Sequence, residues 1–274
     1  MSKLQIVIVA IASCVILGAG AMLIKTAMEY KQAESEYENL TQYTAQTDTA
    51  QELPAEPVSP VELPEEEEEP VKELRQNLNR EDFPDIEVDF DGLKEVNSDF
   101  VAWLYVGAVG ISYPVVQGED NEYYLHQTFE DKKNSSGCIF MDWEVKKDLS
   151  SWNTFIYGHN MKNGTMFGSL KQFIWNNHLY EKDPYIYLFT EDGIYRYQIY
   201  SFYLDSPDSK MYWTCDTIKE YRQYIRTALG KSVYDCQTEA TEEDNSVTLV
   251  TCSGTGSSKQ RFFVHGIFID RYLY

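Results

Sequence analysis

The sequence predicts a mainly β domain whose strands, about eight in number, close into a barrel with peripheral helices in the connections. The chain contains 21 Tyr and 13 Phe, residue types that favour sheets. From residue 82 onward, short β-branched and aromatic runs are separated by turn signals such as Asp192-Gly193. The sequence also predicts a transmembrane helix and an acidic stalk before the barrel.

The individual elements follow from local patterns. Alternating apolar runs predict strands, and apolar residues at helical spacing predict helices. Thr217 and Glu220 form a capping box that opens a helix, which Gly230 is placed to end. The expected strands are 111–116, 152–158, 185–190, 194–203, 246–251 and 261–270, with one more after a short helix within 90–103; the other expected helices are 120–129 and 166–174.

Residues 1–25 are predicted to form a membrane anchor. The run from Ile6 to Ile24 has 19 residues and no charge, which suffices for a helix that crosses a bilayer core. The alternative is a signal peptide cleaved near Ala21. An uncleaved anchor is favoured because apolar residues continue past that point.

Residues 26–81 are predicted to form a stalk. Its first part, through about Leu40, has helix-forming composition, and its second part carries five prolines around the run 65–69 of glutamates. Residues 26–80 hold 14 acidic and four basic side chains. Repulsion and proline should keep the second part extended, and the full stalk would reach roughly 180 Å at about 3.3 Å per residue. Two interpretations of the stalk remain open: a tether that holds the domain away from the membrane, and a disordered spacer without a function of its own.

The net charge of −21 argues against nucleic acid as a partner, because phosphate binding needs clustered Lys and Arg. The cysteines of the domain show neither a CxxC pair nor the Cys/His spacing of a zinc site. We therefore expect no metal and no cofactor. Cys215 and Cys236 flank the helix at 217–230 and are open to two interpretations, a disulfide or, as favoured, two buried free thiols.

Cys252 is the predicted nucleophile of a cysteine enzyme. It ends a strand and precedes a loop of small residues, which leaves space for a substrate. Arg261 begins the next strand, from which its charge can lower the thiol pKa and bind an oxyanion. His159 ends another strand and opens a polar, Gly-containing loop, a typical place for a functional residue. An ordinary edge-strand cation is the alternative for Arg261.

These residues resemble the sortase family. The run 248–252, Thr-Leu-Val-Thr-Cys, with Arg261 downstream is similar to the sortase signature, and 153–161 resembles the histidine motif of class B sortases. Segments 113–118 and 137–142 also match that class, as does the helix at 217–230. The resemblance covers roughly residues 85–272 in the right order, within the globular domain that the chain pattern places at residues 82–274, and this domain would be the catalytic one.

The resemblance implies a transpeptidase on the outer face of the cell membrane. Cys252 would attack a sorting motif at Thr-Gly or an equivalent bond near the C-terminus of a secreted protein. His159 would shuttle the proton and Arg261 would hold the oxyanion. The acceptor would be an amine of peptidoglycan or of its lipid-linked precursor.

The resemblance further implies that Asn121, Leu125 and Thr251 contact the substrate; their alternatives are a helix cap, a core leucine and a strand hydroxyl. Cys138 departs from the family, where Ser is usual, and would be a second reactive thiol if exposed. Three other functions remain open at this point: a sortase that polymerises pilin, a hydrolase that releases peptides to water, and a catalytically silent binding module.

Overall fold

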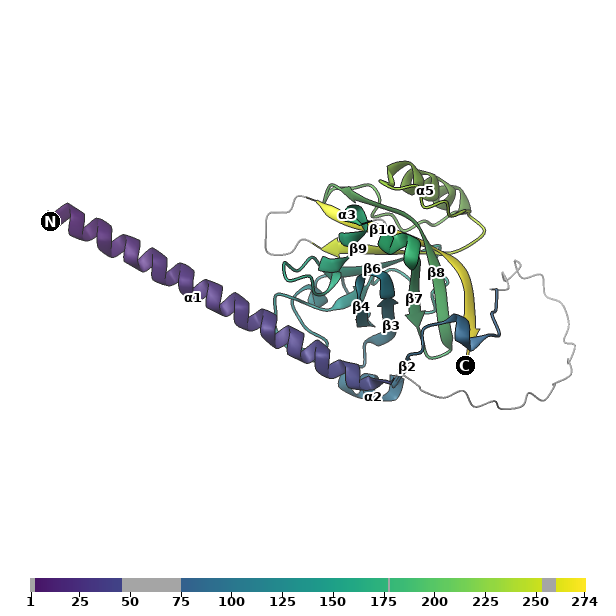
Figure 1. Cartoon of the computed structure of the whole chain (residues 1–274), viewed down its shortest axis with the longest axis horizontal. Coiled ribbons are helices and arrows are strands. Elements are labelled where there is room, and N and C mark those ends of the chain that lie inside the picture. Colours follow the sequence, from purple (N-terminus) through teal and green to yellow (C-terminus); the bar gives the residue numbers. More distant parts are fainter. Residues whose placement is uncertain (1–2, 46–74, 177, 253–259) are drawn as a thin grey trace, which may run out of the picture.

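The computed structural model describes residues 3–45, 75–176, 178–252 and 260–274. Eight strands close into a barrel in the order β10-β8-β7-β3-β4-β5-β6-β9, so the predicted fold class is confirmed (Figure 1). The strands are β3 (Phe100–Val106), β4 (Ile111–Val116), β5 (Ile139–Met141), β6 (Asn153–His159), β7 (Tyr185–Phe189), β8 (Gly193–Asp205), β9 (Ser246–Cys252) and β10 (Arg261–Leu273).

Most neighbouring strands are antiparallel, but two pairs, β4–β5 and β6–β9, are parallel. The β6–β9 pair joins segments that are more than 90 residues apart in the sequence. Asn153 begins β6, and its side-chain Oδ1 accepts hydrogen bonds from the hydroxyls of Ser246 (3.0 Å) and Thr248 (2.8 Å) on β9. This buried amide favours the observed register of the pair, because in another register its Oδ1 would lose both donors.

The apolar residues form two clusters. The larger one contains strand residues of the barrel such as Trp103, Leu104 and Ile186, together with residues of α1 that pack on the barrel, such as Tyr37. The other lies between the barrel wall and helix α5 (Ile218–Lys231), around Phe155 and Tyr224. Helix α5 thus covers one face of the barrel (Figure 1).

Buried His265 joins the barrel wall to α5. Its Nδ1 lies 3.2 Å from the hydroxyl of Tyr224 on α5 and 3.0 Å from that of Thr248 on β9. Its Nε2 lies 3.0 Å from the hydroxyl of Tyr203 on β8. Burial lowers the pKa of His265 to about 3, so the ring is neutral at physiological pH and serves as a structural hydrogen-bonding group.

Helix boundaries differ from the predictions at three places. The capping box at Thr217 and Glu220 is present, but α5 continues through Gly230 to Lys231, because Gly230 does not adopt the left-handed conformation that ends a helix. The helix predicted at 120–129 is only the turn η4 (Tyr123–Leu125). There the carbonyls of Tyr124 and His126 accept from the amides of Cys138 and Asn134, so they are not available for the hydrogen bonds of a longer helix.

The third difference is the helix predicted at 166–174. It is divided into η5 (Phe167–Ser169) and α3 (Gln172–Trp175). The remaining short elements are η1 (Thr41–Tyr43), β1 (Thr44–Ala45), η2 (Arg80–Asp82), β2 (Glu87–Val88), α2 (Phe90–Val96), η3 (Gly107–Val109) and α4 (His178–Lys182). Strand β5 was not predicted, because its three residues are all buried and show no alternation.

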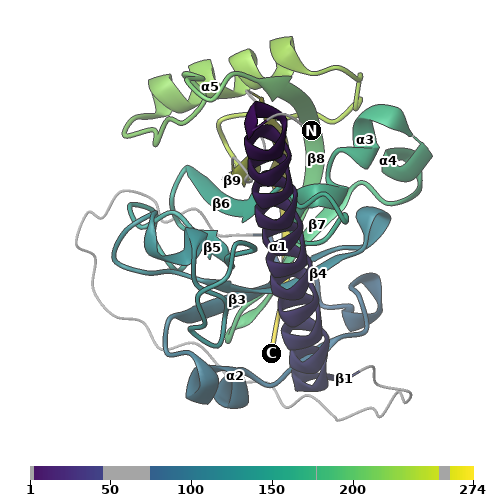
Figure 2. The ribbon, with the colours of Figure 1, turned by 90° about the vertical axis from the view of Figure 1, so that its left-hand side faces the viewer.

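The chain begins with α1 (Lys3–Leu40), a helix of 38 residues. Its N-terminal half projects away from the barrel, and its C-terminal half lies alongside it (Figures 1 and 2). Among the described residues it is the one helix long and apolar enough to cross a membrane. Most of the region predicted to be an extended stalk, residues 46–74, lies outside the described residues.

Candidate active site

The structure brings the strand positions of His159 and Cys252 side by side. The last pair in the β6–β9 register is His159 with Cys252, at the ends of both strands. For Cys252 the structure describes the strand position and not the side chain. Two residues proposed for catalysis, 93 positions apart in sequence, are therefore direct cross-strand neighbours.

The imidazole of His159 is buried, and one of its two nitrogens forms a hydrogen bond. Its Nε2 lies 2.8 Å from the carbonyl oxygen of Leu125, and because a carbonyl only accepts, Nε2 must carry the hydrogen. Its Nδ1 is buried and has no hydrogen-bond partner within the described part of the chain. Nδ1 is therefore the nitrogen left to exchange a proton with a group beside the ring.

The surroundings of His159 favour the neutral ring. Burial lowers its pKa below the ordinary value, and the positive charges of His126 and Arg261 act in the same direction. The hydrogen bond to the Leu125 carbonyl opposes this effect by favouring the charged form. The imidazolium is therefore a minority species at neutral pH.

Gly137 makes room for this arrangement. Its φ is +57°, a value that disfavours residues with a Cβ. A Cβ at this position would lie 2.5 Å from the carbonyl oxygen of Tyr124 and 3.0 Å from Cδ2 of His159. The absent side chain lets the 137–138 segment pass close beneath the imidazole.

Arg261 lies at the start of β10, next to the end of β9. In the register of these antiparallel strands Phe263 lies opposite Val250. The same register, extended by two residues, would bring Arg261 opposite Cys252. The hydroxyl of Thr251 accepts a hydrogen bond from the amide of Phe262 (2.9 Å) and so ties the two strand ends together.

A groove of about 280 Å³ runs beside these strand ends. It contains Arg261 and all three residues expected to contact the substrate, since its lining consists of Asn121, Leu125, Phe140, Tyr157, Tyr212, Thr251 and Arg261. Sequence reasoning missed three aromatic residues here. Tyr157 lies within a matched motif two positions before His159, and Phe140 lies in the middle of β5 within another. Tyr212 lies in an irregular segment without any signal.

A buried carboxylate holds the polar side of the groove. Asp142 Oδ2 accepts hydrogen bonds from the Tyr157 hydroxyl (2.8 Å) and from the Asn121 amide (3.0 Å). The Asn121 side chain also accepts from the backbone amide of Trp143 (3.1 Å). Asn121 and Tyr157 therefore lie in fixed orientations.

The other three cysteines of the barrel domain are buried. Cys138 is fully buried, and burial raises its pKa to about 12, so the exposed second thiol considered from sequence is not present. Cys215 and Cys236 are buried free thiols, which confirms the favoured interpretation over a disulfide. Among the described residues, no group of His, Cys, Asp and Glu is arranged to hold a metal ion.

Comparison with known proteins gives the family. The model of the sortase domain matches residues 104–268, which is more than half of the chain. The chain belongs to the sortase family. Sortase B of Listeria monocytogenes is 31% identical over 163 residues, covering 58% of this chain and 65% of the relative's length. Sortase B of Staphylococcus aureus is 30% identical over 176 residues, covering 64% of this chain and 72% of that protein.

Solved structures agree with this assignment. A Staphylococcus aureus sortase B–substrate complex matches with a TM-score of 0.62 and 30% identity, covering 66% of this chain and 84% of the other. These relatives place this sortase in class B, as the motifs at 153–161 and 248–252 predict.

We expect Asp142 to act on substrate affinity through Asn121 and Tyr157. Asp142→Ala should raise KM for a peptide substrate, because two groove donors lose an ionised acceptor, with a loss of about 1.5–3 kcal/mol, or roughly 10–150-fold, in kcat/KM. Tyr157→Phe should give a smaller rise. Steady-state kinetics at several peptide concentrations separate KM from kcat.

Asp148→Asn is the matched control, since this exposed carboxylate lies on the same connection but outside the groove. A purely structural role for Asp142 would lower the unfolding temperature and leave KM of the folded enzyme unchanged. That result would contradict the assignment.

Proposed function

We propose that this sortase cleaves a C-terminal sorting motif of secreted proteins at Thr-Gly, or an equivalent bond, and transfers them to an amine of the cell wall. Cys252, His159 and Arg261 are the proposed catalytic residues. The pairing of His159 with Cys252 at the ends of β6 and β9, beside a groove that contains Arg261, is the observation that carries this proposal.

In the first step the Cys252 thiolate attacks the carbonyl carbon of the scissile bond. The carbonyl oxygen becomes an oxyanion, which the Arg261 guanidinium stabilises. The protonated His159 donates its proton to the leaving amine, the carbon–nitrogen bond breaks, and a thioester with Cys252 remains. The groove lined by Asn121, Leu125 and Thr251 would hold the motif in this step.

In the second step an amine of peptidoglycan or of its lipid-linked precursor attacks the thioester. Neutral His159 accepts a proton from the attacking amine, and Cys252 leaves as the thiolate. The tautomer fixed by Leu125 leaves Nδ1 for both proton transfers. The exposed apolar residues of α1 from Ala12 onward support a single membrane span, and the proposed catalytic domain would lie outside the cell.

Labelled LPxTG-like and NPxTN-like peptides, incubated with the protein and an amine acceptor, test the reaction by mass spectrometry. We expect a ligated product whose formation depends on the acceptor. Cys252→Ala should abolish turnover, and Arg261→Ala should lower kcat by about 10²–10³, as loss of an oxyanion donor commonly does. Arg261→Lys keeps the charge and should recover part of the rate.

Other results would contradict the proposal. A Cys252→Ala protein with normal turnover would remove the nucleophile assignment. Cleavage that an amine neither accelerates nor captures would indicate a hydrolase. Ligation to a lysine of a candidate pilin, in preference to wall-type amines, would indicate a pilus-polymerising enzyme.

We expect a bell-shaped dependence of kcat/KM on pH. The rate requires thiolate and imidazolium together. Since the imidazolium is the minority form at neutral pH, the rate should fall below the pKa of His159, where the ring is already protonated and only thiolate is lost, and above the pKa of the thiol, where only imidazolium is lost. Because burial lowers the pKa of His159, the acid limb should lie below the ordinary histidine value of about 6.5. A rate with neither an acid nor an alkaline limb between about pH 4 and 10 would contradict the ion pair.

A further inference from the structure

Both ends of the segment 46–74 are attached to the barrel domain. On the N-terminal side, β1 pairs with β2, with Thr44 opposite Val88 and Ala45 opposite Glu87. The amide of Asp89 also donates to the carbonyl of Tyr43 (2.8 Å). The chain is therefore already fixed to the domain before residue 46.

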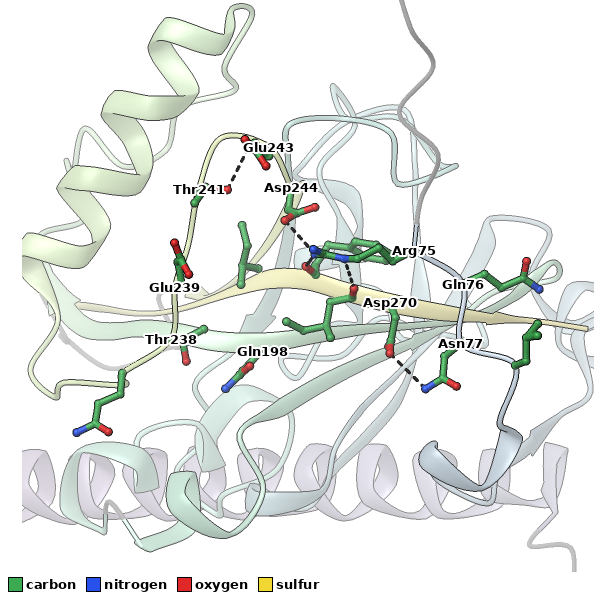
Figure 3. A pocket seen from close by; sticks show the side chains of 15 residues that line it. Arg75, Gln76, Asn77, Gln198, Thr238, Glu239, Thr241, Glu243, Asp244 and Asp270 are labelled. Carbon is green, nitrogen blue, oxygen red and sulfur yellow. Dashed lines mark hydrogen bonds and ion pairs between the residues drawn. The ribbon is translucent and has the colours of Figure 1, made fainter.

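On the C-terminal side, residues 75–77 run along β10 (Figure 3). The guanidinium of Arg75 donates to the carbonyls of Ile269 (2.7 Å) and Phe268 (3.0 Å) and forms an ion pair with Asp244 (2.9 Å). Backbone hydrogen bonds join Arg75 and Asn77 to Arg271. Because the chain leaves the domain at Ala45 and is back on it at Arg75, the length of 46–74 cannot set the distance between α1 and the barrel.

Helix α1 contacts the barrel directly through its C-terminal half. Its first hydrogen bonds to the barrel are made by Glu29, whose carbonyl and carboxylate accept from Asn134 (3.0 Å) and Ser135 (2.8 Å). One turn or more later, Ala33, Tyr37 and Leu40 are buried. The Tyr37 hydroxyl donates to the carbonyl of Gly137 (2.7 Å), the residue beneath His159.

A buried carboxylate lies within this contact. Glu36 is 4% exposed, and it accepts from the amide of Glu130 (3.0 Å) and faces Lys132 at 3.7 Å. A buried charge needs partners in fixed positions, so the docking of α1 on the 130–135 loop is specific rather than incidental.

The apolar part of α1 ends close to this docked part. The uncharged run ends at Ile24, and Glu29 follows Lys25 by only four positions. At about 1.5 Å per residue this is roughly 6 Å of helix. Residues 21–40 contain neither Gly nor Pro, so the helix has no built-in hinge between its two parts.

We propose that α1 is a rigid strut that holds the barrel directly at a lipid bilayer surface, with the loop 130–135 facing the headgroups. This rests on the membrane anchoring in the proposed function. The free half of α1 and the ends of β9 and β10 that border the groove lie on the same side of the barrel (Figure 1). The reaction would then take place at the bilayer surface, and not at the end of a stalk that reaches roughly 180 Å into the wall.

The test uses the full chain in phosphatidylcholine–phosphatidylglycerol vesicles that contain a headgroup-attached quencher. A fluorescent amino acid is placed at exposed Lys133 on the docking loop, or, as the matched control, at Tyr274 on the opposite side of the barrel (Figure 1). We expect strong quenching at Lys133 and weak quenching at Tyr274. Replacement of residues 46–74 by a Gly/Ser linker of about 15 residues should change neither value.

A second variant breaks the strut by insertion of about 20 Gly/Ser residues after Lys25. Quenching at Lys133 should then fall to the Tyr274 level. Equal quenching at the two sites of the unaltered chain, or a changed Lys133 value after replacement of 46–74, would overturn the strut. Vesicle flotation separates the strut from the proposed function. A chain that does not float with the vesicles refutes the membrane anchor as well as the strut. Cys252-dependent peptide transfer is measured independently and tests the proposed reaction.

Discussion

The proposed site depends on the parallel pairing of β6 with β9. A shift of one residue in this register would turn every side chain of one strand to the opposite face, and His159 would no longer lie beside Cys252. The register is set at the far end of the pair, where Asn153 accepts from Ser246 and Thr248. A buried amide at the beginning of the two strands thus determines which residues meet at their ends, where the chemistry is proposed.

Burial of His159 has two opposing consequences for catalysis. It fixes the tautomer through the Leu125 carbonyl and keeps Nδ1 for proton transfer, but it also lowers the pKa and makes the imidazolium scarce. Arg261 also has two opposing effects. Its positive charge favours a thiolate and an oxyanion, but it disfavours the imidazolium form of His159. A small population of a well-positioned ion pair is the expected compromise.

Sequence reasoning located the parts of the site that local patterns encode. Cys252 and His159 each end a strand, and the motifs around them identified the family and the groove residues Asn121, Leu125 and Thr251. Contacts between distant segments carry no local pattern, so Tyr212 in the groove and the role of Asp142 were not foreseen. The helical composition through Leu40 was correct, but composition does not show which face of a helix is covered, and the docking of Glu29, Glu36 and Tyr37 on the barrel required the structure.

Disulfide trapping tests most directly whether residues 159 and 252 are neighbours. In the His159→Cys variant, mild oxidation should form an intramolecular disulfide with Cys252, detected as a cross-linked peptide by mass spectrometry. The matched variant Tyr157→Cys carries the new thiol two positions away, opposite Val250, and should form this cross-link far more slowly. Absence of the 159–252 disulfide, or faster formation from position 157, would contradict the register and with it the proposed active site.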